Sequence, residues 1–473
     1  MKILYVAPEA APFSKTGGLG DVAGSLPRAL LGHGADVRVI LPLYEATGDY
    51  WRRQMTFCKY IFVALGWRSQ YCGLFSLERD GVTYYFVDNE YYFKRPQIYG
   101  FFDDAERFAF FCRAVVELLP ELGWRPDIVS CNDWQTALVP IYLKREPSDF
   151  YRGIKTVFTI HNIEYQGKYG ADILEDVFGL PVELYENGAM RYEGAVNLMK
   201  SAIYEADYIT TVSPTYAMEL TEPYFAAGMH NAIRDNSFKL RGIINGIDFD
   251  VYNPETDEKL PCAFSASDMS GKAANKRELQ REFGLEENPD IPIIACVSRL
   301  VGHKGFDLVL AAIDTVMSWN VQLVVMGTGD HEFEQHFAYK ASEHCGRMAV
   351  RIEYSEFLSA RIYAGADLFL MPSRSEPCGL SQMIAMRYGT LPVVRETGGL
   401  RDTVRPWPGE GSNGFSFQHY STDYMLGALW EATSLYRDDR ASWDALRQRA
   451  AETDFGWGKS AGEYMEMYGN LLN

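Results

Sequence analysis

Residues 297–305, with the sequence V-S-R-L-V-G-H-K-G, carry two cations whose spacing suits an anionic leaving group. Arg299 and Lys304 stand five residues apart, in a short loop after an apolar run that predicts a buried strand. A planar guanidinium and a compact ammonium can together neutralise the charge that grows on a departing diphosphate. A solvated basic loop is the alternative that the spacing alone leaves open.

A second loop combines a carboxylate with backbone amides. In the stretch P-S-R-S-E-P-C-G-L, Glu376 follows another apolar run, and Pro377 fixes the turn into a predicted helix. Sugar hydroxyls need both acceptors and donors, which the carboxylate and the N–H groups of Cys378, Gly379 and Leu380 would supply. Glu376 could equally be an acidic residue that complements the helix dipole.

Two further predicted strands end in polar residues. His161 and Asn162 follow one apolar run directly, and Asp133 follows another. Ligands of open α/β sheets bind outside the carboxyl ends of the strands, so His161 and Asp133 are candidate site residues. An isolated histidine is often structural, however, and Asp133 could cap the next helix instead of facing a cleft.

One short motif occurs twice. The sequence T-G-G-L-G-D at residues 16–21 returns as T-G-G-L-R-D at residues 397–402, each time between a predicted strand and a predicted helix. Paired glycines let backbone N–H groups approach a ligand, and a helix N-terminus favours an anion. Two such loops predict one ligand held in a cleft between two domains, with Lys15 as a further contact; two ordinary glycine turns are the alternative.

Strand and helix patterns that would position these residues alternate along the chain, as is typical of parallel α/β folds. The predicted strands are residues 2–7, 36–41, 84–87, 127–131, 155–160, 208–212, 293–297, 322–326, 349–352, 368–371 and 391–394. The predicted helices are residues 21–33, 105–119, 189–206, 306–319, 331–344, 379–388 and 422–435. We therefore expect two Rossmann-like domains, residues 1–242 and 243–454, followed by a separate helix at residues 455–473.

Composition excludes several kinds of partner. The 473 residues include 45 Lys plus Arg against 63 Asp plus Glu, a net charge of −18, which argues against nucleic acid or an anionic membrane. The eight cysteines lack the spacing of a zinc site, which favours a reduced intracellular chain without metal. Neither a membrane span nor a signal peptide is predicted, so a cytoplasmic protein is expected.

Other enzyme classes lack their motifs here. There is no G-x-x-x-x-G-K-[ST], H-E-x-x-H or G-x-S-x-G sequence, so kinase, zincin and serine-hydrolase functions have no support. Aromatic residues make up 14% of the chain, with clusters at residues 84–86 and 91–93. These rings suit either stacking on sugars or an ordinary core.

The motifs together resemble the bacterial glycogen and starch synthases. The similar segments, in the family's order, are K-T-G-G-L-G-D-V at residues 15–22, H-N at 161–162 with Y-Q-G at 165–167, V-S-P-T-Y at 212–216, I-N-G-I-D at 244–248, S-R-L at 298–300 with K-G at 304–305, E-P-C-G-L at 376–380 and T-G-G-L at 397–400. The resemblance implies a GT-B fold, with the active site between two Rossmann-like domains and the terminal helix returning to the first. It also implies a retaining glucosyltransferase that elongates an α-1,4-glucan (glycogen) from ADP-glucose, without a metal.

The resemblance also implies roles for individual residues. The donor's diphosphate would meet Arg299 and Lys304, helped by the backbone at Thr397, Gly398 and Gly399, and from the other domain Lys15, Gly17 and Gly18. The transferring glucose would contact His161, Asn245, Glu376, Cys378, Gly379 and Leu380, while Tyr354 would stack on the adenine and Asp133 would lie towards the acceptor. His303 and Ser375 depart from the family's usual glutamine and aromatic residue, which places fine substrate selection in question.

Three readings of the function remain distinct at this point. The first is a glycogen synthase in which Arg299 and Lys304 assist departure of ADP while the acceptor hydroxyl attacks from the same face; Glu376 is either a covalent nucleophile or a ligand of sugar hydroxyls. The second is another retaining GT-B glucosyltransferase with a different donor nucleotide or with a small or lipopolysaccharide acceptor. The third is a non-catalytic glucan-binding protein, which the presence of all the charged site residues opposes.

Overall fold

The computed structural model describes all 473 residues and divides into two compact units. Unit 1 comprises Met1–Gly246 and Trp457–Asn473, and unit 2 comprises Ile247–Gly456. No helix of either unit is both long and apolar enough to cross a membrane.

Unit 1 contains a nine-stranded sheet with the order β12-β11-β7-β6-β1-β2-β5-β4-β3. Its strands are β1 (Lys2–Val6), β2 (Asp36–Pro42), β3 (Thr56–Leu65), β4 (Arg68–Arg79), β5 (Val82–Asp88), β6 (Ile128–Asn132), β7 (Lys155–Ile160), β11 (Tyr208–Thr211) and β12 (Leu240–Gly242). The strands pair in parallel from β12 to β5, and only β4 and β3 are antiparallel. The polar residues that follow β1, β6 and β7 therefore lie at one edge of the sheet.

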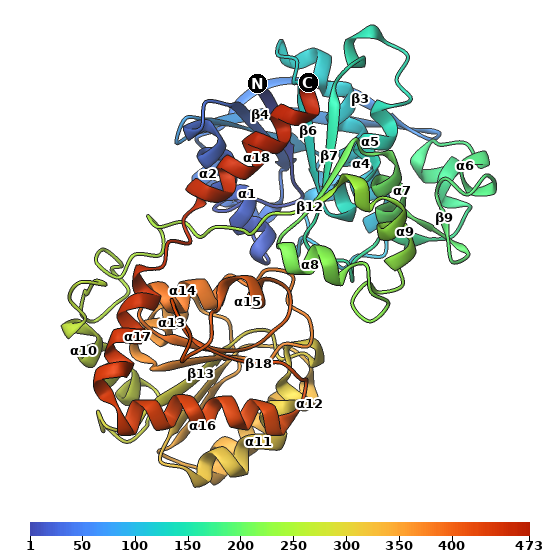
Figure 1. Cartoon of the computed structure of the whole chain (residues 1–473). Helices are drawn as coiled ribbons and strands as arrows, with labels where there is room; N and C mark the ends of the chain where they lie inside the picture. The colour runs from blue at the N-terminus through green and yellow to red at the C-terminus, as the bar shows by residue number, and fades with distance from the viewer. The chain divides into compact units, whose positions relative to one another are not determined.

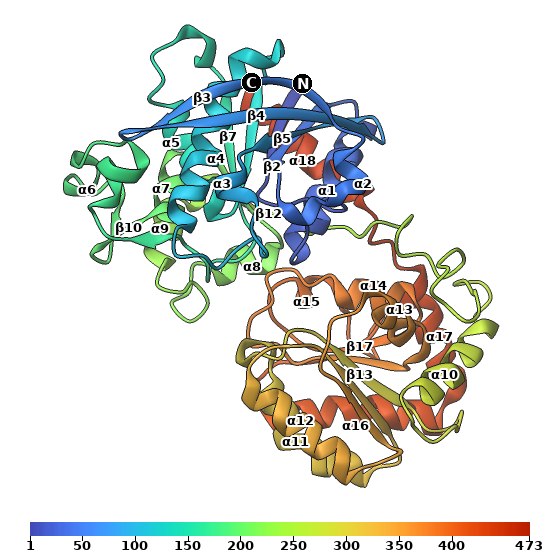
Figure 2. The same cartoon turned by 180° about the vertical axis from the view of Figure 1, so that it is seen from behind.

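Helices cover both faces of this sheet, as Figures 1 and 2 show. They are α1 (Gly18–Gly32), α2 (Gly48–Arg52), α3 (Glu90–Phe93), α4 (Asp104–Leu118), α5 (Leu138–Leu143), α6 (Glu183–Glu186), α7 (Leu198–Glu205), α8 (Pro214–Glu219), α9 (His230–Asp235) and α18 (Trp457–Leu472). Because both faces are covered, the central strands are apolar along their length instead of alternating. Four of the five residues of β1 are buried.

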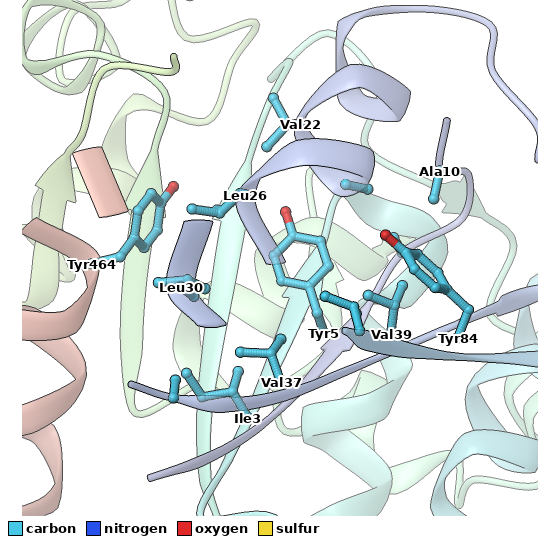
Figure 3. Packing of buried hydrophobic residues seen from close by; sticks show 14 of the residues in the cluster. Ile3, Tyr5, Ala10, Val22, Leu26, Leu30, Val37, Val39, Tyr84 and Tyr464 are labelled. Atoms are coloured by element: carbon cyan, nitrogen blue, oxygen red, sulfur yellow. The ribbon is translucent and has the colours of Figure 1, made fainter. Parts of the chain in front are cut away.

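The terminal helix α18 belongs to the core of unit 1. Figure 3 shows Tyr464 of α18 beside Leu26 and Leu30 of α1, which separate it from Tyr5 of β1 in the same cluster. Trp457, Ala461, Met467 and Tyr468 of the same helix are buried in this cluster.

Unit 2 contains a six-stranded, fully parallel sheet with the order β15-β14-β13-β16-β17-β18. Its strands are β13 (Ile293–Val297), β14 (Gln322–Met326), β15 (Met348–Arg351), β16 (Leu368–Met371), β17 (Leu391–Arg395) and β18 (Phe415–Phe417). Its helices are α10 (Ser270–Glu282), α11 (Phe306–Ser318), α12 (His331–Glu343), α13 (Glu356–Gly365), α14 (Ser381–Arg387), α15 (Gly398–Thr403), α16 (Thr422–Asp438) and α17 (Arg440–Glu452). Within the unit, α11, α12 and α16 lie on one face of the sheet, and α13 and α14 lie on the other (Figures 1 and 2).

The predicted helix at residues 189–206 is wrong over its first half. Residues Arg191–Tyr192 (β9) and Ala195–Asn197 (β10) form a hairpin, which joins Lys168–Tyr169 (β8) in a small sheet. Glu193 and Gly194 both have positive φ, 50° and 81°, as a two-residue hairpin turn requires. Only α7 is helical, and Asn197 begins it by accepting a hydrogen bond from Lys200 N at 2.9 Å.

The aromatic clusters at residues 84–86 and 91–93 are mostly core. Tyr84, Tyr85, Phe86, Tyr92 and Phe93 are all buried. They fill the space between the sheet and its helices, so stacking on a sugar is not their role; Tyr91 alone of the six is exposed.

Candidate active site

A buried carboxylate shapes the first glycine loop. Glu9, three residues after β1, accepts hydrogen bonds from Thr16 N (2.9 Å), Thr16 Oγ1 (2.6 Å) and Gly20 N (3.0 Å). Burial raises the pKa of Glu9, although these hydrogen bonds oppose the shift. Glu9 was not predicted as a functional residue, because nothing in the local sequence marks an acid whose partners lie 7 and 11 residues further along the chain.

The loop that Glu9 holds exposes its backbone. Lys15 pairs with Asp21 (Nζ to Oδ1, 2.8 Å), and α1 begins at Gly18. Gly17 is exposed and extended, with φ −162°, and no atom lies within 4 Å of the place that a Cβ would occupy. A bulky anion could therefore approach this backbone closely.

Asp133 links two neighbouring strands and does not cap a helix. Its Oδ1 accepts hydrogen bonds from His161 N (2.7 Å) and Asn162 N (3.4 Å), and it makes no side-chain cap contact with the turn that follows. The capping alternative is therefore wrong. Its φ of 57° with ψ of 177° lies in a region that costs a non-glycine residue about 1–3 kcal/mol. Burial raises the pKa of the Asp133 carboxyl to about 7.

His161 is a neutral histidine. Its ring Nε2 lies 2.9 Å from Oδ1 of Asn132, the last residue of β6. Burial lowers the pKa of the His161 ring to about 3. The ring is therefore uncharged at neutral pH.

Asn245 presents an unsatisfied acceptor in unit 1. The residue is only 5% exposed, and its buried Oδ1 has no hydrogen-bond partner. A buried polar atom without a partner costs about 1–3 kcal/mol, which a ligand donor at this atom would offset.

In unit 2 the structure brings Lys304 and Glu376 together. Lys304 Nζ donates to both oxygens of Glu376, at 2.9 and 2.7 Å, and Ser373 Oγ donates to Glu376 Oε2 at 3.0 Å. Lys304 ends the short 3-10 turn Gly302–Lys304 after β13, while Ser373 and Glu376 lie in the loop after β16. Neighbouring parallel strands thus place the two predicted groups in direct contact.

Further charged groups and a histidine lie near this ion pair. Burial lowers the pKa of His303, and the positive charges of Lys304 and Arg299 lower it further. Arg299 itself is exposed. The cations Lys304 and Arg299 and the carboxylates of Glu376 and Asp330 all act on His303, and its lowered pKa favours the uncharged ring.

The second glycine loop serves a different purpose from the first. Gly399 N donates to the carbonyl oxygens of Glu376 and Pro377, each at 3.1 Å. A Cβ on Gly399 would lie 2.1 Å from Cys378 O, and one on Gly398, where φ is 44°, would lie 1.9 Å from Glu376 O. These glycines let Thr397 and its neighbours pack directly on the backbone that carries Glu376.

The remaining predicted donor residues lie around the same loop or near it. Cys378, Gly379 and Leu380 precede α14; Gly379 has φ of 70°, and Gln382 Nε2 donates to the carbonyl of Gly379 at 2.8 Å. Tyr354 follows β15 and is 65% exposed.

Comparison with known proteins identifies the family. A family model described as the starch synthase catalytic domain matches residues 2–235, and one described as glycosyl transferases group 1 matches residues 276–443. A glycogen synthase of Geobacillus thermodenitrificans is 48% identical over 477 aligned positions, covering 100% of this chain and 98% of the relative. One from Clostridium beijerinckii is 46% identical, with 100% and 99% covered. The chain belongs to the glycogen and starch synthase family.

Solved structures support the same assignment. The catalytic domain of starch synthase IV from Arabidopsis thaliana, solved with ADP and acarbose bound, is 36% identical and matches with a TM-score of 0.93 over 99% of each chain. Sucrose-phosphate synthase from Thermosynechococcus elongatus, at 17% identity and a TM-score of 0.63, shares the fold alone, covering 100% of this chain and 99% of its own. The predicted GT-B fold and the predicted glucosyltransferase family are confirmed.

Proposed function

We propose that this glycogen synthase relative transfers glucose from ADP-glucose to the non-reducing end of an α-1,4-glucan, with retention, and so elongates glycogen in the cytoplasm. The Lys304–Glu376 ion pair, with Arg299 and His303 near it, is the observation that carries the proposal. The two cations of this loop, Arg299 and Lys304, are the groups that can neutralise a donor diphosphate.

Each unit is proposed to supply its own binding residues. In unit 2, Arg299 and Lys304 neutralise the diphosphate as ADP departs, and Tyr354 stacks on the adenine. Around them the glucose and phosphates are bound by Glu376, Cys378, Gly379, Leu380, Thr397, Gly398 and Gly399. In unit 1, Lys15, Gly17 and Gly18 approach the donor, His161 and Asn245 lie near the transferring glucose, and Asp133 faces the acceptor.

Glu376 is proposed to bind sugar hydroxyls and orient Lys304, not to act as a covalent nucleophile. Both of its oxygens accept hydrogen bonds from the Lys304 ammonium, and one accepts a further bond from Ser373. Engaging the lone pairs of a carboxylate lowers its nucleophilicity. A front-face reaction, in which the acceptor hydroxyl attacks as ADP leaves, needs no protein nucleophile. Detection of a glucosyl adduct on Glu376 by mass spectrometry would overturn this assignment.

Replacement of Lys304 tests the leaving-group role. Lys304→Ala at saturating ADP-glucose should lower kcat about 10²- to 10³-fold, as losing one preorganised transition-state contact does. Lys340→Ala is the matched control, because Lys340 is a lysine of the same unit paired with Asp314 at 2.7 Å on the surface. Wild-type kcat in Lys304→Ala would show that the diphosphate is stabilised elsewhere.

A donor and acceptor matrix tests the reaction as a whole. Glucose transfer is measured with ADP-glucose or UDP-glucose, each with glycogen or with a small sugar as the acceptor. The proposal requires the highest kcat/KM with ADP-glucose and glycogen. Preference for UDP-glucose or for the small sugar would favour a different glucosyltransferase, and no transfer in any combination would favour a glucan-binding protein.

A further inference from the structure

A buried hydrogen-bond network lies behind the His161 ring. Oδ1 of Asn132 receives the Tyr5 hydroxyl at 2.9 Å and lies 2.9 Å from His161 Nε2, while Asn132 Nδ2 donates to Val6 O at 2.9 Å. Asn132 is fully buried and Tyr5 is 2% exposed. The network joins the ends of β1 and β6 to the residue that follows β7.

The contacts of Asn132 determine which way its amide points. Val6 O can only accept, so the neighbouring atom must be the NH2 group of Asn132. A rotated amide would place Oδ1 against this carbonyl, and would leave the Tyr5 hydroxyl and the ring facing the NH2 group. Oδ1 therefore faces the His161 ring, and it can only accept.

The proton of the neutral His161 ring is thereby assigned. An acceptor opposite Nε2 requires that Nε2 carry the hydrogen, which leaves Nδ1 without one. Nδ1 has no hydrogen-bond partner in the protein, and His161 is partly exposed. Nδ1 is therefore an open acceptor.

We propose that Asn132, oriented by Tyr5, is a positioning residue that holds His161 in the Nε2–H form, so that Nδ1 accepts a hydrogen bond from a hydroxyl of the transferring glucose. The identity of the bound hydroxyl group rests on the proposed function, whereas the tautomer does not. A neutral acceptor suits a sugar whose anomeric carbon becomes positive during transfer, because an imidazolium at the same place would repel that charge.

The groups facing the ring give it no anionic partner. Asn132 and Tyr5 are uncharged, and burial raises the pKa of Tyr5 far above neutrality. Asp133 contacts the backbone N–H of His161 and not the ring. Neutral hydrogen bonding thus fixes the tautomer where a carboxylate would favour a charged ring.

Nitrogen NMR of the full-length protein labelled with ¹⁵N-histidine tests the assignment without any turnover. The His161 signals are identified by their loss in His161→Gln. In the wild type, Nε2 should carry the hydrogen and Nδ1 should not, from pH 5.5 to pH 8. A protonated Nδ1, or a doubly protonated ring at neutral pH, would overturn the proposal.

Variants of the network separate positioning from folding. Asn132→Leu should give a mixture of both tautomers of the His161 ring. Tyr5→Phe keeps the aromatic ring and removes one hydroxyl, so it should lower kcat/KM several-fold with a smaller change in the tautomer ratio of His161. Asn132→Asp should produce a charged ring near neutral pH and move the acid limb of the kcat/KM profile to higher pH. Unchanged nitrogen signals in all three folded variants would contradict the role of Asn132.

Asn236→Leu is the matched control, since Asn236 is another buried asparagine of unit 1 whose Nδ2 donates to one carbonyl, Ala232 O at 2.9 Å. It should leave the His161 signals and kcat/KM as in the wild type; an altered His161 signal here would show that any buried change perturbs the ring. If the tautomer is as predicted but no glucose transfer occurs with any donor, the positioning role stands and the proposed function fails.

Discussion

Asp133, which is buried, and its neighbour His161, which is partly exposed, have pKa values shifted in opposite directions. Burial raises the pKa of Asp133 from an ordinary 3.8 to about 7 and lowers that of His161 from 6.5 to about 3. Both shifts favour the uncharged form of each group. Because Asp133 contacts only the backbone of His161, the two side chains do not neutralise each other by forming an ion pair.

The two shifts predict opposing effects of pH on stability. A carboxyl with a raised pKa contributes stability that is lost as the pH rises from about 4 to 7, whereas a histidine with a lowered pKa contributes stability that is gained from about pH 3 to 6.5. In the wild type these contributions largely cancel. Asp133→Asn removes the contribution to stability that decreases as the pH rises. The difference in Tm between this variant and the wild type (variant minus wild type) should therefore increase from pH 4 to pH 7.

Thermal unfolding followed by circular dichroism measures this difference. The reciprocal variant His161→Gln should show the opposite slope, since it retains only the contribution of Asp133. Parallel Tm curves for the wild type and both variants would show that these groups are not titrating in the predicted ranges.

The sequence predicted the residues that are marked by their type and their place after a strand. This pattern predicted Arg299, Lys304 and Glu376 as site residues, and the structure brings Lys304 and Glu376 into contact. Glu9 and Asn132 could not, because their partners are brought near by tertiary folding: Glu9 binds a loop, and Asn132 contacts residues 127 positions before it and 29 after it. Only side-chain geometry reveals such positioning groups.

At the scale of elements, most parallel strands were predicted to within one or two residues, because a buried parallel strand is an unbroken apolar run. The antiparallel strands β3 and β4 were missed. Their residues are largely exposed or half-buried, so they lack that pattern. The helix predicted at residues 189–206 failed where the Glu193–Gly194 turn and the hairpin around it override helical periodicity.

The two T-G-G-L loops predict different responses to the same substitution. Gly399→Ala places a methyl group 2.1 Å from Cys378 O, and such overpacking costs about 1–3 kcal/mol or more. Gly17→Ala meets no atom within 4 Å and leaves an allowed φ of −162°, so its effect on stability should be within about 0.5 kcal/mol. Denaturant unfolding should therefore show a clear decrease in the free energy of unfolding for Gly399→Ala and not for Gly17→Ala.

Kinetics of the same pair test what the first loop does. If the donor approaches the backbone at Gly17, Gly17→Ala should raise the KM for ADP-glucose although its stability is unchanged. An unchanged KM would mean that Gly17 is needed neither for stability nor for binding of ADP-glucose. The contribution of the loop to donor binding would then come from Lys15.

At the scale of the whole molecule, the chain passes between the units twice. The first passage lies at Gly246–Ile247 and the second at Gly456–Trp457. Within unit 2 the two passing segments pair, with Ile247 N donating to Phe455 O at 2.9 Å. Seventeen residues at the C-terminus thus complete the core of the unit in which the chain begins.

This arrangement predicts that a substitution in α18 destabilises unit 1, which contains the first half of the chain. Unit 2 should be unaffected, although its residues are closer to α18 in the sequence. Tyr464 of α18 is 1% exposed in the core of unit 1, and removing a buried aromatic ring costs about 3–5 kcal/mol. Hydrogen exchange followed by mass spectrometry should show faster exchange in peptides of residues 1–246 of Tyr464→Ala, with peptides of residues 247–456 unchanged.

Tyr436→Ala is the matched control for this prediction. Tyr436 is 3% exposed in unit 2, where its hydroxyl donates to Pro289 O at 2.8 Å, and its loss should speed exchange in unit 2 alone. Equal acceleration in both halves by either variant would show that the two units unfold together, because each half would then depend on the other's core.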